Sequence, residues 1–133
     1  MKISEKKSVE WFLRVALSIG FLSAVADRFG FWPQALSAWG NWDNFVAYTG
    51  KLNPWVPGLF IPFVSGISTL LEIVFGVGLL TNFKTSLVAK GAGFLLLIFG
   101  LAMALFQNVK APLDYSVFAG SAAAFALSIM TKK

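Results

Sequence analysis

Charged side chains within apolar stretches are the residues of this sequence that could do chemistry. Arg14, Glu72 and Lys90 each lie among apolar neighbours, and Ser68 stands one helical turn before Glu72. A charge at the centre of a membrane helix costs at least about 2.5–3.5 kcal/mol on the insertion scale unless it is paired or hydrated. These residues therefore indicate either a buried ion pair or a binding site for the polar group of a ligand.

Depth along the predicted helices places Arg14 and Glu72 close together. Counted from the same membrane surface, Arg14 lies about 9 Å deep and Glu72 about 13 Å deep. Because an arginine side chain spans this difference, an Arg14–Glu72 bridge is predicted. With Ser68 and Lys90 nearby, these groups are the expected anchors for a quinone, whose carbonyl needs donors and whose quinol hydroxyl needs an acceptor.

Two other interpretations of these charges remain open. Arg14 can pair with Glu10, four residues earlier, with both side chains reaching to the membrane surface and Lys90 doing likewise. Glu72 can belong to a structural bridge that fixes helix register, instead of a ligand-binding or proton-carrying site.

A second polar layer is expected nearer the opposite membrane surface. The helical stripe that carries Arg14 also carries Arg28, so an inward Arg14 brings Arg28 inward. Asp114 and Tyr115, which open the fourth apolar stretch, are expected to join Arg28 or Asp27 there. On the first helix the stripe comprises Arg14, Ser18, Phe21 and Arg28, and on the second Ser65, Ser68, Thr69, Glu72 and Gly76.

Composition identifies the kind of protein that holds these charges. Of the 133 residues, 57% are hydrophobic and 13% charged, whereas soluble domains carry about 25% charged residues. Four apolar stretches, residues 9–26, 58–80, 86–106 and 113–130, approach the length of about 20 residues that a membrane helix needs. The predicted fold is all-α: one polytopic transmembrane domain, residues 1–133, built as a four-helix bundle in a lipid bilayer.

The sequence contains no Cys and no His. It therefore lacks the ligands of ordinary zinc sites, haem and iron–sulfur clusters, and any Cys–His or Ser–His nucleophile. No metal site and no cofactor bound covalently or through His or Cys is expected, whereas a quinone remains compatible. The cationic residues are scattered among apolar runs, so nucleic acid is not an expected partner.

Positive charge predicts the orientation in the membrane. Eight of the 11 Lys and Arg residues lie with the termini and the second loop, and three lie on the opposite side. The positive-inside rule therefore places both termini in the cytoplasm. An alternative is that Ala24-Val25-Ala26 before Asp27 is the cleavage site of a secretory signal, although Glu10 and Arg14 would interrupt the apolar region of such a signal.

The outer loop, residues 29–57, carries four of the five Trp residues. A short helix is expected from Pro33 to Gly40, and a second from its cap at Asn41 to a stop at Gly50. The aromatic residues are interpreted as an interfacial belt on these helices, with a ligand lid as the alternative. They are Trp32, Trp39, Trp42 and Trp55.

Small residues recur at intervals of four on two of the predicted helices. The first stripe is Ala16, Gly20 and Ala24, and the second is Ser116, Gly120, Ala124 and Ser128. Such stripes let helices approach closely, either within the bundle or between two copies of the chain.

Three segments together resemble the DoxX-like family of small four-span membrane proteins: RVALSIGFLSAVADRFG, LLEIVFGVGLLTNFKT and APLDYSVFAG. The pattern is carried by Arg14, Asp27, Arg28, Glu72, Gly76 and Asp114. The resemblance implies a four-helix bundle in the bacterial cytoplasmic membrane. Some members of the family are subunits of quinone-linked oxidoreductases of sulfur compounds, and distant eukaryotic ones assist assembly of other membrane proteins.

The resemblance therefore implies two alternative functions for the chain. One is an accessory, quinone- or lipid-interacting subunit of a membrane oxidoreductase complex, with redox subunits as partners. The other is a non-catalytic interaction or assembly protein that binds other membrane proteins through its helix faces.

Overall fold

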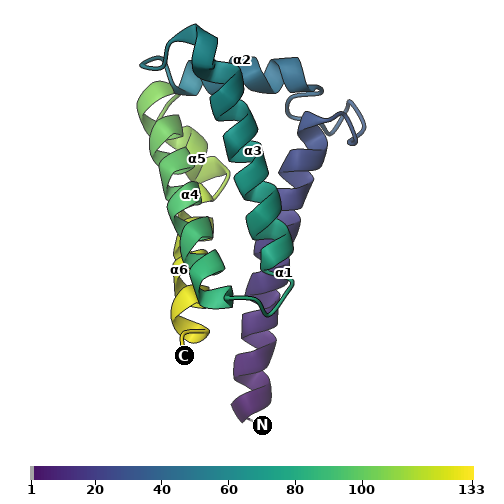
Figure 1. Ribbon diagram of the computed structural model, residues 1–133, viewed down its shortest axis with the longest axis vertical. Coiled ribbons are helices and arrows are strands. Elements are labelled where there is room, and N and C mark those ends of the chain that lie inside the picture. The colour runs from purple at the N-terminus through teal and green to yellow at the C-terminus, as the bar shows by residue number, and fades with distance from the viewer. Residues whose placement is uncertain (1) are drawn as a thin grey trace.

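The computed structural model describes residues 2–133, with side chains from Ser4 onward, so the Lys2 side chain counted above lies outside the described residues. Within this part of the chain the fold is all-α, as predicted. The helices are α1 (Lys2–Arg28), α2 (Trp42–Leu52), the 3-10 helix η1 (Gly58–Phe60), α3 (Ile61–Gly78), α4 (Thr85–Phe106), α5 (Lys110–Asp114) and α6 (Val117–Met130) (Figure 1).

Three segments of the described chain are long and apolar enough to cross a membrane: Ser4–Arg28, Gly58–Gly78 and Thr85–Phe106. Their outer faces carry large exposed apolar side chains, such as Phe12, Phe63 and Leu101. Exposure of so much apolar surface on a small monomer is unfavourable in water and favourable in contact with lipid. The chain is therefore a multi-pass membrane protein whose helices contact the bilayer.

The fourth apolar stretch differs from the continuous helix predicted over residues 113–130. It is divided into α5 and α6 by a break at Tyr115 and Ser116, where Ser116 adopts a left-handed conformation (φ 55°). Pro112 lies in the first turn of α5, where its missing N–H is tolerated, and Asn108 Oδ1 accepts from Ala111 N at 2.7 Å. The 14 residues of α6 span about 21 Å, less than the roughly 30 Å hydrocarbon core.

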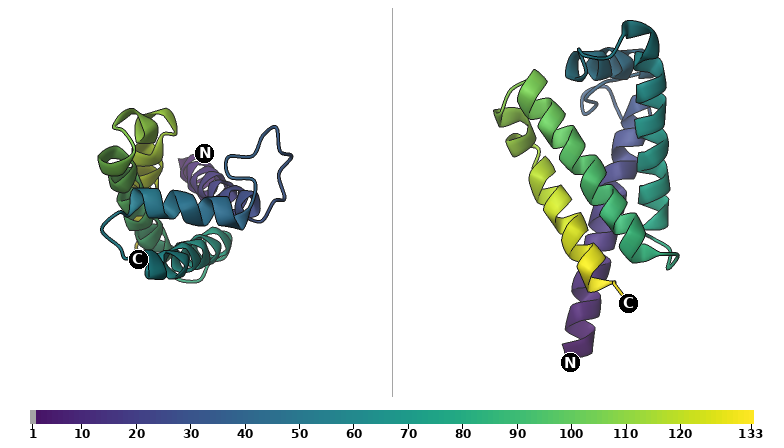
Figure 2. Two further views of the ribbon diagram at one scale, coloured as in Figure 1. Left: turned by 90° about the horizontal axis from the view of Figure 1, so that it is seen from above. Right: turned by 60° about the vertical axis from the view of Figure 1, so that its left-hand side comes forward.

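The helices pack as two antiparallel pairs, α1 with α3 and α4 with α6. Figure 2 shows the two pairs inclined to each other, with α2 lying across the end of the molecule opposite the termini. We call the end where α1 begins and α6 finishes the terminal end, and the end covered by α2 the loop end. The connection between α3 and α4 also lies at the terminal end (Figure 1).

The predicted inward stripes are confirmed on both α1 and α3. Arg14, Ser18, Phe21 and Arg28 are buried on α1, and Ser65, Thr69, Glu72 and Gly76 are buried on α3, with Ser68 half-buried at the edge. The two stripes face each other, and the Ser18 hydroxyl donates to the Gly76 carbonyl oxygen at 2.5 Å. This contact fixes the register of α1 against α3.

The two small-residue stripes have different surroundings. On α6, Ala124 and Ser128 are buried against α4, and the neighbouring Ser121 hydroxyl donates to the Gly93 carbonyl oxygen at 2.7 Å. On α1, Ala16 and Gly20 are exposed, and a Cβ at Gly20 would meet no neighbouring element within 4 Å. Only the stripe of α6 therefore serves packing within the bundle.

The segment before α2 forms one turn at Pro33–Ser37, so the helix predicted from Pro33 to Gly40 is wrong. The reason is the carboxylate of Asp27, which accepts from the Ser37 hydroxyl and from Ala38 N (2.7 Å) and draws the chain back onto the end of α1. Gly40, at φ +84°, then turns the chain into α2.

The predicted start of α2 is confirmed, because Asn41 Oδ1 accepts from Asn44 N at 2.9 Å. The predicted stop at Gly50 is wrong by two residues, since the helix continues to Leu52. Gly50 serves packing instead: a Cβ there would lie 3.6 Å from the Ile61 side chain of α3.

Gly100 provides a test of the contact between α4 and α6. A Cβ at Gly100 would lie 2.7 Å from a ring carbon of Phe118, whereas Gly66 on α3 faces open space. We expect Gly100→Leu to lower the free energy of unfolding in detergent by about 1–3 kcal/mol through overpacking. Gly66→Leu removes an interior helical glycine without that contact and should have no such cost. Equal stability of the two variants would contradict the close α4–α6 packing.

Candidate functional site

A buried ion pair joins α1 to α3 below α2. Arg28 Nη1 contacts Glu72 Oε2, and both residues are only 3% exposed. The same Nη1 donates to Thr69 Oγ1 at 2.8 Å. The guanidinium also lies 3.8 Å from the ring centroid of Phe45 and 5.2 Å from that of Trp39. We call these five residues the loop-end cluster.

Helix geometry explains why Arg28 and Glu72 meet. Side chains lean toward the N-terminus of their own helix. Because α1 and α3 are antiparallel, Arg28 leans toward the terminal end and Glu72 toward the loop end. Measured from the Ser18–Gly76 contact, their backbones lie about 15 Å and about 6 Å toward the loop end. The two long side chains close the remaining gap.

The predicted Arg14–Glu72 bridge is wrong for the same reason. Arg14 lies about 6 Å from the Ser18 level on the terminal side and leans further away from Glu72. Its Nη1 instead pairs with Glu10 Oε2 at 3.0 Å. The i,i+4 pairing that the sequence left open is therefore observed, but neither side chain reaches outward: Arg14 is 2% exposed and Glu10 is buried.

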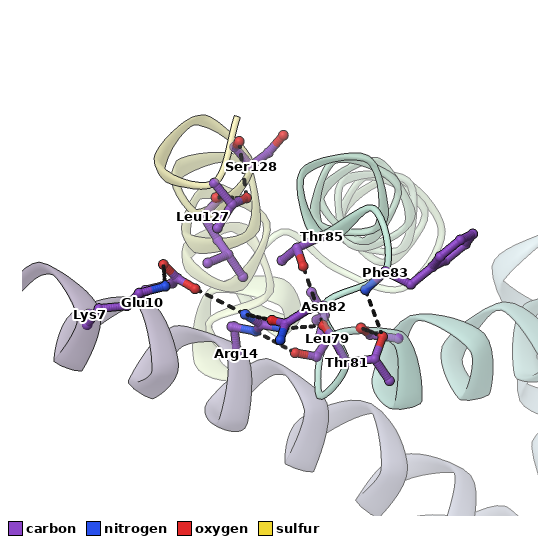
Figure 3. Close-up of polar contacts among 12 residues, drawn as sticks. Lys7, Glu10, Arg14, Leu79, Thr81, Asn82, Phe83, Thr85, Leu127 and Ser128 are labelled. Carbon is purple, nitrogen blue, oxygen red and sulfur yellow. Dashed lines mark hydrogen bonds and ion pairs between the residues drawn. The ribbon is translucent and has the colours of Figure 1, made fainter. Parts of the chain in front are cut away.

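Arg14 caps the end of α3 at the terminal end (Figure 3). Its Nε donates to the Leu79 carbonyl oxygen at 2.7 Å, its Nη2 donates to the Thr81 carbonyl oxygen, and its Nη1 reaches Asn82 Oδ1 at 3.2 Å. Its guanidinium lies 3.9 Å from the ring centroid of Trp11. Carbonyl groups at a helix end lack partners within the helix, so Arg14 with Glu10 forms a structural cap.

The remaining predicted polar anchors are not brought together. Lys90 is exposed on α4, and Ser68 donates to the Ser65 carbonyl oxygen of its own helix at 3.1 Å. The structure therefore does not join Lys90 or Ser68 to Arg14 and Glu72. Arg14 and Glu72, two of the four predicted quinone anchors, belong to separate clusters.

Asp114 and Tyr115 do not join Asp27 or Arg28 as expected. Asp114 pairs locally with Lys110 Nζ at 2.6 Å on the surface, and Tyr115 is 75% exposed. The break between α5 and α6 accounts for this difference, because α5 packs mainly against α4 and α6. Asp27 is occupied instead by Ser37 and Ala38 of the loop.

The four loop tryptophans take different positions. Trp39 belongs to the loop-end cluster, and Trp32 Nε1 donates to the Ser23 carbonyl oxygen at 3.1 Å. Trp42 stacks on Phe29 with ring centroids 5.4 Å apart, whereas Trp55 is exposed. The contact of Trp39 and Phe45 with Arg28 was not foreseen, because it depends on the path that Asp27 imposes on the loop.

A groove of about 310 Å³ lies beside α1 at the loop end. Its floor contains Gly20 and Ala24 of the outward small-residue stripe, and Trp32 and Trp39 stand in its walls. We call it the α1 groove; it is lined by Gly20, Ser23, Ala24, Asp27, Trp32, Leu36, Ala38 and Trp39. Trp39 thus both lines the groove and lies 5.2 Å from the guanidinium of Arg28, whose Nε has no hydrogen-bond partner among the described residues.

A further polar contact ties α2 to the end of α4. The Tyr48 hydroxyl donates to Gln107 Oε1 at 2.7 Å. Burial, and to a smaller extent the nearby Tyr115, raises the pKa of Tyr48 above its ordinary value. The phenol therefore stays protonated and keeps donating at neutral pH.

Comparisons of the chain with protein-family models, with curated proteins and with solved structures give no match. The geometry itself then defines what the site can do. A groove with aromatic and aliphatic walls, and with a positively charged group beside one of its lining residues, suits a molecule with an apolar tail and an electron-rich polar head.

Proposed function

We propose that this membrane protein binds an amphiphile, an isoprenoid quinone or a phospholipid, at its loop end. The apolar tail lies in the α1 groove, and the polar head reaches Arg28. The observation that carries the proposal is that one side chain, Trp39, both lines the groove and covers the guanidinium of Arg28.

The floor of the groove supports the placement of the tail. No atom outside the adjoining backbone of α1 lies within 4 Å of where a Cβ of Gly20 would be, so α1 is open at this point. With Ala24 beyond it, the helix offers a smooth apolar surface that a hydrocarbon or isoprenoid chain can cover. Trp32 and Leu36 supply apolar walls.

The loop-end cluster supports the placement of the head. A quinone carbonyl and a lipid phosphate both accept hydrogen bonds from a guanidinium. Arg28 Nη1 is engaged by Glu72 and Thr69, which leaves Nε without a described partner. Rotation of Trp39 would join the groove to this donor, while Glu72 compensates the charge of Arg28.

Filling the groove tests the proposal. Gly20→Leu places a side chain in the groove and should weaken amphiphile binding at least about tenfold, whereas Gly66→Leu, at an equally open site on α3, should not. The measurement is mass spectrometry of quinones and phospholipids that remain with the purified protein, which also identifies the class bound. Equal retention of quinones and phospholipids by both variants would contradict the proposed site.

The resemblance to the DoxX-like family supports a role as an accessory subunit of a bacterial membrane oxidoreductase, with the amphiphile as the shared molecule. In this role the redox centre belongs to a partner subunit.

The charge distribution supports an orientation with both termini in the cytoplasm. A reporter that is active only in the periplasm should stay silent when fused after Lys133, and activity there would reverse the orientation.

A non-catalytic interaction or assembly protein is the second candidate, and the exposed Ala16 and Gly20, with the half-buried Ala24, favour it. Such a face suits a close contact with a helix of another membrane protein or of a second copy. Ala16 does not line the α1 groove. Ala16→Leu should therefore prevent helix docking, measured by cross-linking in membranes, and leave amphiphile retention unchanged; loss of retention would argue against two separate functions.

A further inference from the structure

Exposed lysines gather at the terminal end of the molecule. The start of α1, the connection between α3 and α4, and the end of α6 all lie there (Figure 1). The side-chain carboxylates described at this end are Glu5 and Glu10, and Glu10 is already engaged by Arg14 and Lys7. The exposed lysines are Lys6, Lys7, Lys84, Lys90, Lys132 and Lys133.

Packing of α4 against α6 brings four of these lysines onto neighbouring elements. The Ser86 hydroxyl donates to the Ser128 carbonyl oxygen at 2.8 Å, so the start of α4 lies beside the end of α6. Lys84, two residues before Ser86, therefore neighbours the residues that follow α6, and Lys90 lies one turn beyond Ser86 on α4. We call Lys84, Lys90, Lys132 and Lys133 the basic patch; none of them forms an ion pair with a described carboxylate.

The depth of Lys90 indicates which partner the basic patch needs. Lys90 lies about 9 Å further along α4 than Lys84, on the exposed surface of a membrane-length helix. An unpaired ammonium is unstable in hydrocarbon, and its long stem lets it reach back to the headgroup region. Phe83 is exposed beside Lys84, with its ring centroid 5.6 Å from Lys84 Nζ, and can insert at the same level.

We propose that the basic patch binds the phosphate headgroup of an anionic phospholipid in the adjacent leaflet. The charges are complementary, and the apolar stems of the lysines and Phe83 fit the boundary between headgroups and acyl chains. This site lies at the opposite end of the molecule from the α1 groove. This proposal therefore does not depend on whether the α1 groove binds an amphiphile.

The test compares two double variants of equal charge. Lys84→Gln with Lys90→Gln alters the basic patch, and Lys51→Gln with Lys110→Gln removes the same charge at the loop end. Each protein is placed in phosphatidylcholine vesicles that contain a small fraction of phosphatidylglycerol, and the phosphatidylglycerol that remains bound after purification is measured by mass spectrometry. We expect about a fivefold loss for each patch lysine removed, a wild-type level in the control, and weaker wild-type retention at high salt.

Charge-conserving Lys84→Arg with Lys90→Arg should retain phosphatidylglycerol, which separates loss of binding from loss of folding. Full retention by the glutamine variant of the patch would overturn the proposal, as would an equal loss in the two double variants. Displacement of phosphatidylglycerol by inorganic phosphate, beyond that caused by sodium chloride at equal ionic strength, would show a site for free phosphate and would also overturn it.

Discussion

Glu72→Gln should lower the free energy of unfolding by about 3–5 kcal/mol, because it leaves a buried cation without its counter-charge. Arg28 is almost fully enclosed by α1, α3 and the rings of Trp39 and Phe45, so water cannot replace the lost carboxylate. Reversible unfolding in mixed micelles measures the loss. Detachment of α2 should accompany it and should increase hydrogen exchange in residues 42–52.

A double-mutant cycle measures the interaction energy between Arg28 and Glu72 separately from the contacts that each makes with other residues. Arg28→Met should destabilise the protein by a similar amount, whereas Arg28→Met with Glu72→Gln should be less harmful than the sum of the two. The surface pair Lys110–Asp114 is the control: Asp114→Asn should change stability by less than about 1 kcal/mol. Strictly additive losses for Arg28 and Glu72 would mean that the two side chains do not interact.

Arg14→Leu should have an effect of similar size at the terminal end. It leaves the Leu79 carbonyl group without its side-chain donor, and it leaves the Thr81 carbonyl and the buried Glu10 carboxylate with only their longer contacts to Thr85 and Lys7. We expect a loss of about 3–5 kcal/mol. Hydrogen exchange should rise first in the connection between α3 and α4. Unfolding in detergent gives the size of the loss.

Arg14→Lys is the informative control for this cap. It keeps the charge but cannot donate in the directions that a guanidinium reaches at once, so it should recover only part of the loss. Wild-type stability of Arg14→Leu would contradict the cap. Full recovery by lysine would show that charge alone matters at this position.

Helical periodicity predicted which faces of α1 and α3 turn inward. Arg14, Ser18, Phe21 and Arg28 on α1 and Glu72 with its neighbours on α3 fall on single stripes, and a polar stripe in a membrane helix must face protein. The sequence therefore predicted that these charged side chains are buried. It did not identify their partners.

Partner choice depends on information that periodicity lacks. Depth counted from the ends of the apolar stretches ignored the lean of each side chain toward the start of its helix, and this lean carries Arg14 away from Glu72 and Arg28 toward it. The register between α1 and α3 is fixed by the Ser18–Gly76 contact, which joins residues 58 positions apart. Attention to side-chain direction would have favoured Arg28 over Arg14.

The loop and the fourth apolar stretch were harder to predict for a different reason. The fourth stretch is divided at Ser116, which adopts a left-handed conformation, and the path of the loop depends on the contacts of Asp27 with Ser37 and Ala38. Such contacts override weak local preferences for helix. The groove beside α1 follows from the Asp27 contacts, because they place Trp32 and Trp39 along the helix.

Fluorescence quenching shows whether an amphiphile occupies the α1 groove. With Trp11, Trp42 and Trp55 replaced by Phe, the emission comes from Trp32 and Trp39, which stand in the groove walls. A phospholipid with brominated acyl chains, and separately a quinone, is titrated into the protein in micelles. We expect saturable quenching by at least one of them that Gly20→Leu abolishes and Gly66→Leu preserves. Quenching that rises in proportion to added amphiphile, equally in all three proteins, would contradict a bound amphiphile in the groove.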